Sequence, residues 1–171
     1  MISTMENDER HTISCLVENR AGVLARIASL FSARGYNIDS LAVGITEKPD
    51  VSRMTIVVRG DDKILEQVLK QLDRLVDVIR VTDYRTISHI ERDLALIKVK
   101  ASKDQRSEIM QICAIFRYKI IDVAPQSLVI EATGDEEKIS ALLDILRPFG
   151  VLEMSRTGIV AVARGETSLS V

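Results

Sequence analysis

The sequence lacks the features that mark nucleic-acid-binding, membrane and secreted proteins. Its formal net charge is −2, and this balance predicts no binding to nucleic acid or to an anionic membrane. Basic residues between positions 70 and 85 are interleaved with Asp73, Asp77 and Asp83, a mixture typical of a solvated face. No apolar stretch approaches the ~20 residues that cross a bilayer. The N-terminal "MISTMENDER" is polar and acidic, unlike a signal peptide, so we expect a cytoplasmic protein.

Catalytic and metal-binding motifs are also missing. The chain contains no HExxH, Walker loop, GxGxxG or CxxC pattern, so we assign no catalytic residues and no metal ligands. His11 stands at the start of a predicted strand and His89 in a connector, and we expect both to be exposed polar residues. Cys15 and Cys113 lie among apolar residues, which is typical of small buried hydrophobic side chains rather than of redox or nucleophilic groups.

What the sequence does contain is a core-forming composition with clear periodicity. Apolar residues make up 46% of the 171 residues and charged residues 28%, as in chains that fold. Residues 11–18, "HTISCLVE", alternate between apolar and polar, which predicts a strand with one buried face. Apolar residues between 23 and 31 have helical spacing, with Asn19 or its neighbour available as N-cap and Gly35 placed to end the helix.

The remainder of the first half completes a small α+β unit. Residues 41–45 and 54–58 alternate on either side of the polar turn "TEKPDVS", which predicts a hairpin. A second helix and a last strand follow by about residue 82. The order strand, helix, strand, strand, helix, strand is typical of a ferredoxin-like layer, in which helices cover one face of an antiparallel sheet.

The second half repeats this unit in the same register. Asp61 follows Gly60, Asp135 follows Gly134, and apolar residues come 4, 7, 8 and 11 positions after each Asp. These apolar residues are Leu65, Val68, Leu69 and Leu72, and then Ile139, Leu142, Leu143 and Leu146. The pattern predicts two ferredoxin-like βαββαβ domains in tandem. The alternative is a chance match, because this spacing is common to surface helices.

The polar connector "DYRTISHIERD" places the domain boundary near residue 86. The expected closing strand of the second domain is "VLEMSRTGIVAVA", residues 151–163. We therefore expect a polar N-terminal tail over residues 1–10, a first domain over 11–86, a second domain over 87–165 and a C-terminal tail over 166–171.

Two Asn/Gly pairs bracket the first helix: Asn19 with Gly22, and Gly35 with Asn37. A glycine in the first helical turn leaves backbone N–H groups open, and together with the helix dipole they attract a small carboxylate. Asn19 could hold an ammonium group, because its side chain offers both donors and an acceptor. Asn37 lies beyond the other end of the helix, so it could complete such a site only across a symmetric interface with a second copy.

An apolar groove beside these groups would suit an aliphatic amino acid. Its lining would come from Val23, Leu24 and Ile38. An alternative interpretation gives the bracketing residues structural roles only. In that interpretation Asn19 caps the helix, Asn37 forms a loop, and Gly22 lets helix and sheet approach each other.

Longer motifs run through both halves of the chain. They are "ENRAGVLARIASLFSARGYNIDSLAVG", "SRMTIVV", "QLDRLVDVIRV", "ERDLALIKV" and "SRTGIVAVARG". From about His11 to Gly165 the chain resembles the regulatory, or small, subunit of acetohydroxyacid synthase, also called acetolactate synthase. The resemblance implies that residues 11–86 form an ACT domain, which dimerises side by side and binds an amino acid at the dimer interface. It implies that residues 87–165 form a regulatory domain that contacts the catalytic subunit.

The resemblance also implies a function. The small subunits of this family are not catalytic: they bind the catalytic large subunit, raise its activity and confer feedback inhibition by valine, or by leucine or isoleucine. In a homodimer, the implied ligand site consists of Asn19, Gly22, Val23 and Leu24 from one subunit with Asn37 and Ile38 from the other.

The resemblance assigns the cofactors to the other subunit. Thiamine diphosphate, FAD and magnesium are expected in the catalytic subunit, and none in this chain, where the thiamine-enzyme signature "GDG" is replaced by "GDDK" and "GDEE". Ala21 stands where many relatives have proline. The second half has no Asn-x-x-Gly bracket, so no second amino-acid site is expected. The alternative function is a free-standing amino-acid-binding ACT sensor without a catalytic partner.

Overall fold

The computed structural model describes residues 9–170 and divides the chain into two compact units. Unit 1 contains the chain up to Ile90 together with the segment from Ala161 onward, and unit 2 contains Glu91–Val160. The sequence predicts a polar tail over residues 1–10. Residues 1–8 of this segment lie outside the described residues, and Arg10 belongs to the first strand.

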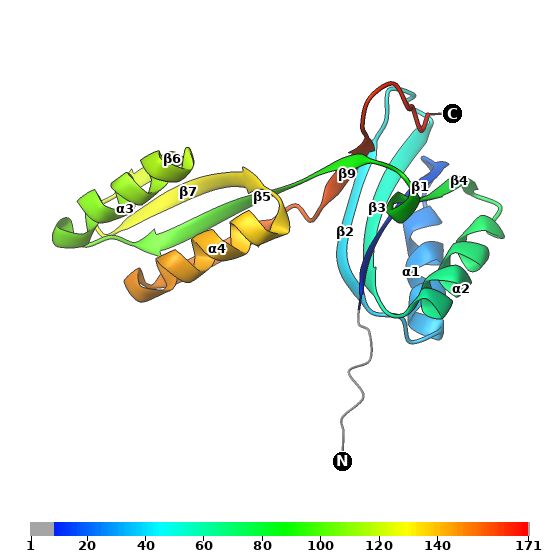
Figure 1. Ribbon diagram of the computed structural model, residues 1–171, viewed down its shortest axis with the longest axis horizontal. Helices are drawn as coiled ribbons and strands as arrows, with labels where there is room; N and C mark the ends of the chain where they lie inside the picture. The colour runs from blue at the N-terminus through cyan, green and yellow to red at the C-terminus, as the bar shows by residue number, and fades with distance from the viewer. Residues whose placement is uncertain (1–8, 171) are drawn as a thin grey trace, which may run out of the picture. The chain divides into compact units, whose positions relative to one another are not determined.

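Unit 1 is an antiparallel sheet covered on one face by two helices (Figure 1). Its elements are β1 (Arg10–Glu18), α1 (Val23–Ala33), β2 (Ile38–Ile45), β3 (Val51–Arg59), α2 (Asp62–Asp73), β4 (Val78–Asp83) and the short 3₁₀ helix η1 (Tyr84–Thr86). The strand order is β2-β3-β1-β4. This arrangement confirms the predicted ferredoxin-like fold, including the hairpin formed by β2 and β3.

The helix-covered face of unit 1 holds a continuous core. Ile13, Cys15 and Val17 of β1 pack against α1 and α2, as the alternation predicted. Helix α2 buries Leu65, Val68 and Leu72 on one face. The two predicted N-caps that start the repeated helices are confirmed: the Asp61 side chain accepts a hydrogen bond from the backbone N–H of Ile64 at 2.8 Å, and Asp135 accepts one from Lys138 at 2.9 Å. This bond also lowers the pKa of the Asp135 carboxyl, because it stabilises the carboxylate.

The prediction that the first strand has one buried face is wrong. The opposite face of β1 is also covered, with Ser14 only 2% exposed. The cover consists of η1 and the C-terminal segment: the Tyr84 hydroxyl donates to the Ala161 carbonyl at 3.1 Å, and Arg53 donates to the Leu169 carbonyl at 2.7 Å. Within the expected C-terminal tail, Leu169 is therefore buried in unit 1.

Unit 2 repeats the fold with its own core. Its elements are β5 (His89–Lys100), α3 (Lys103–Phe116), β6 (Lys119–Ala124), β7 (Ser127–Gly134), α4 (Glu136–Leu146), the 3₁₀ helix η2 (Arg147–Phe149) and β8 (Val151–Arg156). The strand order β6-β7-β5-β8 matches that of unit 1. Helix α4 buries Ile139, Leu142 and Leu146, the counterparts of the buried residues of α2, so the tandem repeat is confirmed.

The prediction of a single closing strand over residues 151–163 is wrong, because this segment forms two strands. The strand is interrupted at 157–159 and continues as β9 (Val160–Ala163), which pairs with β5. Gly158 has φ +80°, a left-handed conformation that breaks the extended chain. The boundaries between the units along the chain therefore fall at residues 90/91 and 160/161. The sequence placed the limits of the second domain at 87 and 165.

We expect Asp61→Ala to lower the free energy of unfolding of unit 1 by about 1 kcal/mol, because it removes the N-cap of α2. Asp61→Asn keeps an acceptor oxygen at the cap and should stay close to the wild type. Urea denaturation followed by circular dichroism measures both. Equal losses in the two variants would contradict the capping role.

Candidate amino-acid site at the start of α1

The connection between β1 and α1 is a tight turn that ends at Gly22. Gly22 is the N-cap of α1 with φ +88° and ψ −14°. The first helical hydrogen bond runs from the Arg26 N–H to the Gly22 carbonyl at 3.0 Å. The N–H groups of Leu24 and Ala25 precede it in the first turn, where a helix provides no acceptor of its own. These outward N–H groups and the helix dipole favour a small anion.

Gly22 is required by backbone conformation and not by close packing. Among the described residues, no atom lies within 4 Å of the position that a Cβ on Gly22 would take. The structural interpretation, in which Gly22 allows helix and sheet to approach each other, is therefore wrong. The space at the Cβ position of Gly22, beside the first turn of α1, is open.

One interpretation of the sequence expected Asn19 to cap the helix, but the N-cap is Gly22. The Asn19 side-chain amide donates to the Pro49 carbonyl at 2.9 Å, and its backbone N–H donates to the Asp50 carbonyl at 2.8 Å. Both acceptors belong to the turn between β2 and β3. Asn19 is exposed, and these two bonds hold it beside the β2–β3 turn, next to the start of β3.

A buried carboxylate fixes the turn from the other side. Asp77 is 5% exposed and accepts hydrogen bonds from Arg20 at 2.9 Å and from Arg26. Its backbone carbonyl also accepts the Glu18 N–H at 2.9 Å. The prediction that the charged run around Asp77 forms a solvated face is wrong at this residue, because its two arginine partners come from a distant part of the sequence.

Val23 and Leu24 point to different environments. Val23 is 5% exposed and belongs to the core of unit 1, whereas Leu24 is 47% exposed. The expected apolar groove can therefore include the side chain of Leu24 but not that of Val23. Val23 can contribute only its backbone, in the first turn of α1.

Asn37 and Ile38 lie at the far end of α1. Asn37 is exposed, and its side-chain amide donates to Asp39 at 3.0 Å. Ile38 begins β2 and is partly buried against the core. Helix α1 has 11 residues, which corresponds to a length of ~16 Å. One chain therefore does not bring Asn37 to Asn19 within reach of a single small ligand.

Cys15, Cys113 and His11 are buried. Burial raises the pKa of the Cys15 thiol to about 12, and it also raises the pKa of Cys113. Both cysteines are confirmed as buried hydrophobic residues. The prediction of an exposed His11 is wrong, since it is 1% exposed and its Nε2 lies 2.7 Å from the Gly60 carbonyl. None of the helices within residues 9–170 has the length and hydropathy that a membrane crossing requires.

Comparison with known proteins places the two units in one family. Residues 13–80 match the model of the "AHAS small subunit-like ACT domain", and residues 92–165 match that of the "Small subunit of acetolactate synthase". The probable acetolactate synthase small subunit of Archaeoglobus fulgidus is 54% identical, over 91% of this chain and 98% of that protein. The acetolactate synthase small subunit of Mycolicibacterium smegmatis is 52% identical, over 91% of each chain.

A solved structure agrees with these sequence matches. The crystal structure of the acetolactate synthase small subunit from Thermotoga maritima aligns with a TM-score of 0.84 at 44% identity. The alignment covers 93% of this chain and 99% of that one.

We expect Asp77→Asn to lower the free energy of unfolding of unit 1 by about 2 kcal/mol, because charge-assisted hydrogen bonds to Arg20 and Arg26 are lost. Hydrogen exchange of residues 19–22 should become faster. Asp73→Asn, an exposed Asp at the end of α2, is the matched control and should change stability by less than ~0.5 kcal/mol. A similar response of the two variants would mean that Asp77 does not hold the turn.

Proposed function

Because the chain belongs to the family of acetolactate synthase small subunits, we propose that it activates a catalytic large subunit and makes it sensitive to feedback inhibition by a branched-chain amino acid. The chain is a regulatory and not a catalytic subunit. We assign thiamine diphosphate, FAD and magnesium to the large subunit, and the complex to the cytoplasm. Valine is the proposed effector, with leucine or isoleucine as the other candidates.

The observation that carries this proposal is the open first turn of α1. Gly22 leaves room in front of the N–H groups of Leu24 and Ala25, and an amino-acid carboxylate would accept hydrogen bonds from them. Asn19, whose side-chain amide donates to the Pro49 carbonyl, lies in the same β1–α1 connection, and Leu24 has an exposed side chain in the first turn. The ligand's carboxylate and side chain thus have complementary groups on one protomer.

The second half of the proposed site comes from a second copy. Strand β2 is an edge of its sheet, with Ile45 66% exposed, and an unpaired edge can pair with another strand. If two β2 edges pair antiparallel about a two-fold axis, the start of one strand meets the end of the other. Asn37 and Ile38 at the start of β2 would then approach the partner's β2–β3 turn, to which Asn19 is bonded.

The apolar part of such a site is small, which suits a branched aliphatic side chain. Leu24 from one protomer and Ile38 from the other would contact it. Valine, leucine and isoleucine differ by a methylene or by its position, which is worth only ~1–3 kcal/mol in an apolar pocket. The preference among them therefore depends on packing details at the dimer interface.

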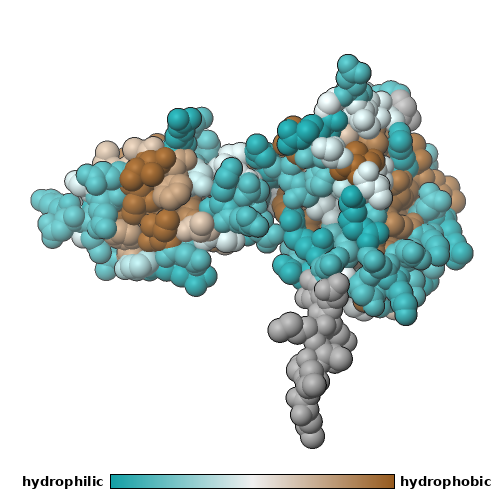
Figure 2. All heavy atoms as spheres, in the orientation of Figure 1, coloured by the Kyte–Doolittle hydropathy of each residue, from teal (hydrophilic) through white to brown (hydrophobic). Residues whose placement is uncertain are grey.

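Unit 2 offers a surface for the large subunit. Figure 2 shows apolar side chains gathered on unit 2 over α3 and β6. The exposed apolar residues of these two elements are Met110, Ile115, Phe116, Ile121 and Val123. Clustered exposed apolar residues are typical of protein interaction sites. We propose that this patch, named the α3–β6 patch, contacts the catalytic subunit.

Binding of the effector and of the large subunit would be linked. If valine inhibits by changing how the regulatory dimer acts on the large subunit, then the large subunit must change valine affinity by the same factor. A coupling of about 1–3 kcal/mol is typical of such regulation. The alternative, a free-standing amino-acid sensor, predicts no such linkage and no co-purifying large subunit.

We expect the purified chain to bind L-valine saturably in calorimetric titrations, and Gly22→Asp to abolish this binding by placing a carboxylate where the ligand carboxylate belongs. Gly22→Asn adds a side chain of the same size as Gly22→Asp at the same backbone position but without the charge. It should therefore retain more valine affinity than Gly22→Asp. Undiminished valine binding by Gly22→Asp would contradict the assigned site.

The shared site has a sharper test in mixed dimers. Asn19→Ala and Asn37→Ala homodimers should each lose valine binding. A dimer of one Asn19→Ala chain and one Asn37→Ala chain contains one site with both asparagines intact, so it should bind one valine. Failure of the mixed dimer to recover binding would mean that the two asparagines do not belong to one intersubunit site.

We expect Ile115→Glu, at a position 75% exposed, to weaken association with the large subunit while leaving valine binding by the isolated chain unchanged. Sedimentation with the purified large subunit and stimulation of acetolactate formation measure this effect. Val76→Glu, at an apolar position of unit 1 that is 88% exposed, is the control. Equal association of both variants with the large subunit would exclude the α3–β6 patch.

A further inference from the structure

His11 occupies a core position at the opposite end of β1 from Asn19. It continues the alternation of Ile13, Cys15 and Val17, and it pairs with Val58 of β3. Only 1% of His11 is exposed. An imidazole at this depth needs partners for both ring nitrogens, because an unpaired buried polar atom costs free energy.

One ring nitrogen has such a partner and the other has none within residues 9–170. Nε2 lies 2.7 Å from the Gly60 carbonyl, which only accepts hydrogen bonds, so Nε2 carries the proton. Nδ1 is buried without a hydrogen-bond partner. In the neutral ring it presents a lone pair to its surroundings.

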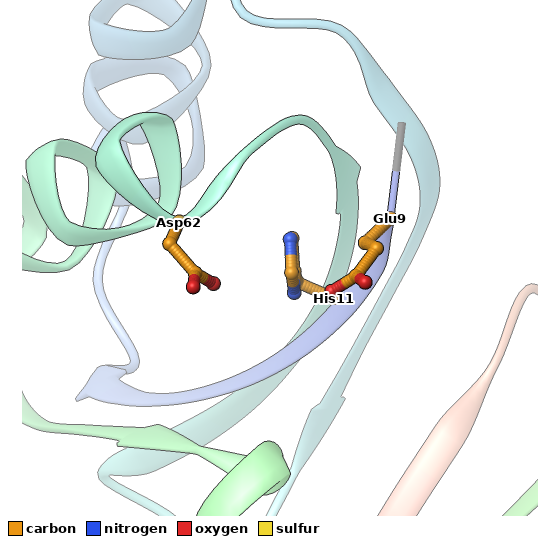
Figure 3. Close-up of side chains that lie close together, drawn as sticks. All are labelled: Glu9, His11 and Asp62. Atoms are coloured by element: carbon orange, nitrogen blue, oxygen red, sulfur yellow. The ribbon is translucent and has the colours of Figure 1, made fainter. Parts of the chain in front are cut away.

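Two carboxylates flank the His11 ring. Figure 3 shows Glu9, from the chain just before β1, and Asp62, from the start of α2, with their carboxylates on either side of the His11 ring. One ligand atom from each of the three residues lies within 4.8 Å of the other two. Two carboxylates beside a buried lone pair favour a cation among them.

The fold itself does not require a polar residue at this position. The repeat aligns the pair Arg10–Arg59 of unit 1 with the pair Leu94–Thr133 of unit 2. The next residue is Ala95 in unit 2, fully buried, and His11 in unit 1. An alanine thus fills in one unit the place that a histidine takes in the other.

We propose that Glu9, His11 and Asp62 bind a divalent transition-metal ion of the Zn²⁺ class. Imidazole and carboxylate oxygens are ligands of such ions. Two carboxylates and a neutral imidazole balance the charge of a divalent cation. The Nε2 donation to a backbone carbonyl is the outer-shell bond that orients most metal-bound histidines.

To hold the ion, the two carboxylates would close on it by side-chain rotation. Glu9 precedes β1 and Asp62 begins α2, and both are exposed, so side-chain rotations would shorten the separations between the ligand atoms. Arg85 opposes this movement, because it forms an ion pair with Asp62. It also pairs with Asp83 at 2.9 Å, which can retain it when Asp62 turns toward the metal.

The ion would join the start of β1 to the start of α2. It would be separate from Asn19 in the same chain, since the eight residues from His11 to Asn19 span ~26 Å along an extended strand. No motif in the sequence marks this site, because its three residues lie in different local patterns. The phase of the alternation, which places His11 with Ile13 and Cys15, is the signal that points to its burial.

The test is a Zn²⁺ titration of the full-length, metal-free chain against a chromophoric chelator. We expect one ion per chain in the wild type and at least tenfold weaker binding in Glu9→Gln and Asp62→Asn. Glu136→Gln is the matched control, because Glu136 begins α4 as Asp62 begins α2, and it should bind as the wild type does. Arg85→Gln should bind more tightly, because it removes the competing cation.

A second readout keeps the test independent of folding defects in variants. The Nδ1 resonance of His11 in nitrogen-15 NMR of the wild type should shift on addition of Zn²⁺. The proposal is overturned if no ion binds, if Nδ1 is protonated and unaffected by Zn²⁺, or if both carboxylate variants bind Zn²⁺ as the wild type does. The last result would place the ion at other groups, such as the cysteine thiols.

Discussion

Burial of β1 on both faces is the constraint on which unit 1 depends. The helices cover one face, and η1 with the C-terminal segment covers the other. β1 also pairs with β3 on one side and β4 on the other, so its ends are fixed in space. One end leads into the turn at Asn19 and Gly22, and the other carries His11. Both proposed sites therefore lie at the two ends of a rigid strand, where polar groups can emerge from an apolar layer.

The two units show how one fold is used in two ways. In unit 1 the turn between β2 and β3 receives the side chain of Asn19 through the Pro49 carbonyl. In unit 2 the corresponding turn receives Arg106, which donates to the Pro125 carbonyl at 3.0 Å. Helix α3 starts after Ser102 in an extended conformation, without a left-handed glycine. Unit 2 thus does not repeat the glycine turn that precedes α1 in unit 1. This difference supports the proposal of a single amino-acid site per chain, with unit 2 used for partner contact.

Local patterns in the sequence predicted most of the fold, and long-range contacts account for what they missed. Period-two alternation and the repeated Asp caps identified β1, α2 and α4, because those signals depend on neighbours in the chain. Part of the second cover of β1 is the C-terminal segment, more than a hundred positions away, and the burial of Asp77 depends on Arg20 and Arg26. The Asn/Gly bracket predicted the candidate site residues. It could not reveal that Val23 faces the core or that Asn19 is bound by Pro49, because these depend on how strands and helix pack.

The central claim is that one amino acid binds between the α1 start of one protomer and the β2 start of its partner. A crystal structure of the dimer with L-valine tests it most directly. The predicted result is a valine carboxylate at the N–H groups of Leu24 and Ala25, with Asn37 and Ile38 of the second protomer around the rest of the ligand. Valine bound wholly within one protomer, or at the start of α3 in unit 2, would contradict it.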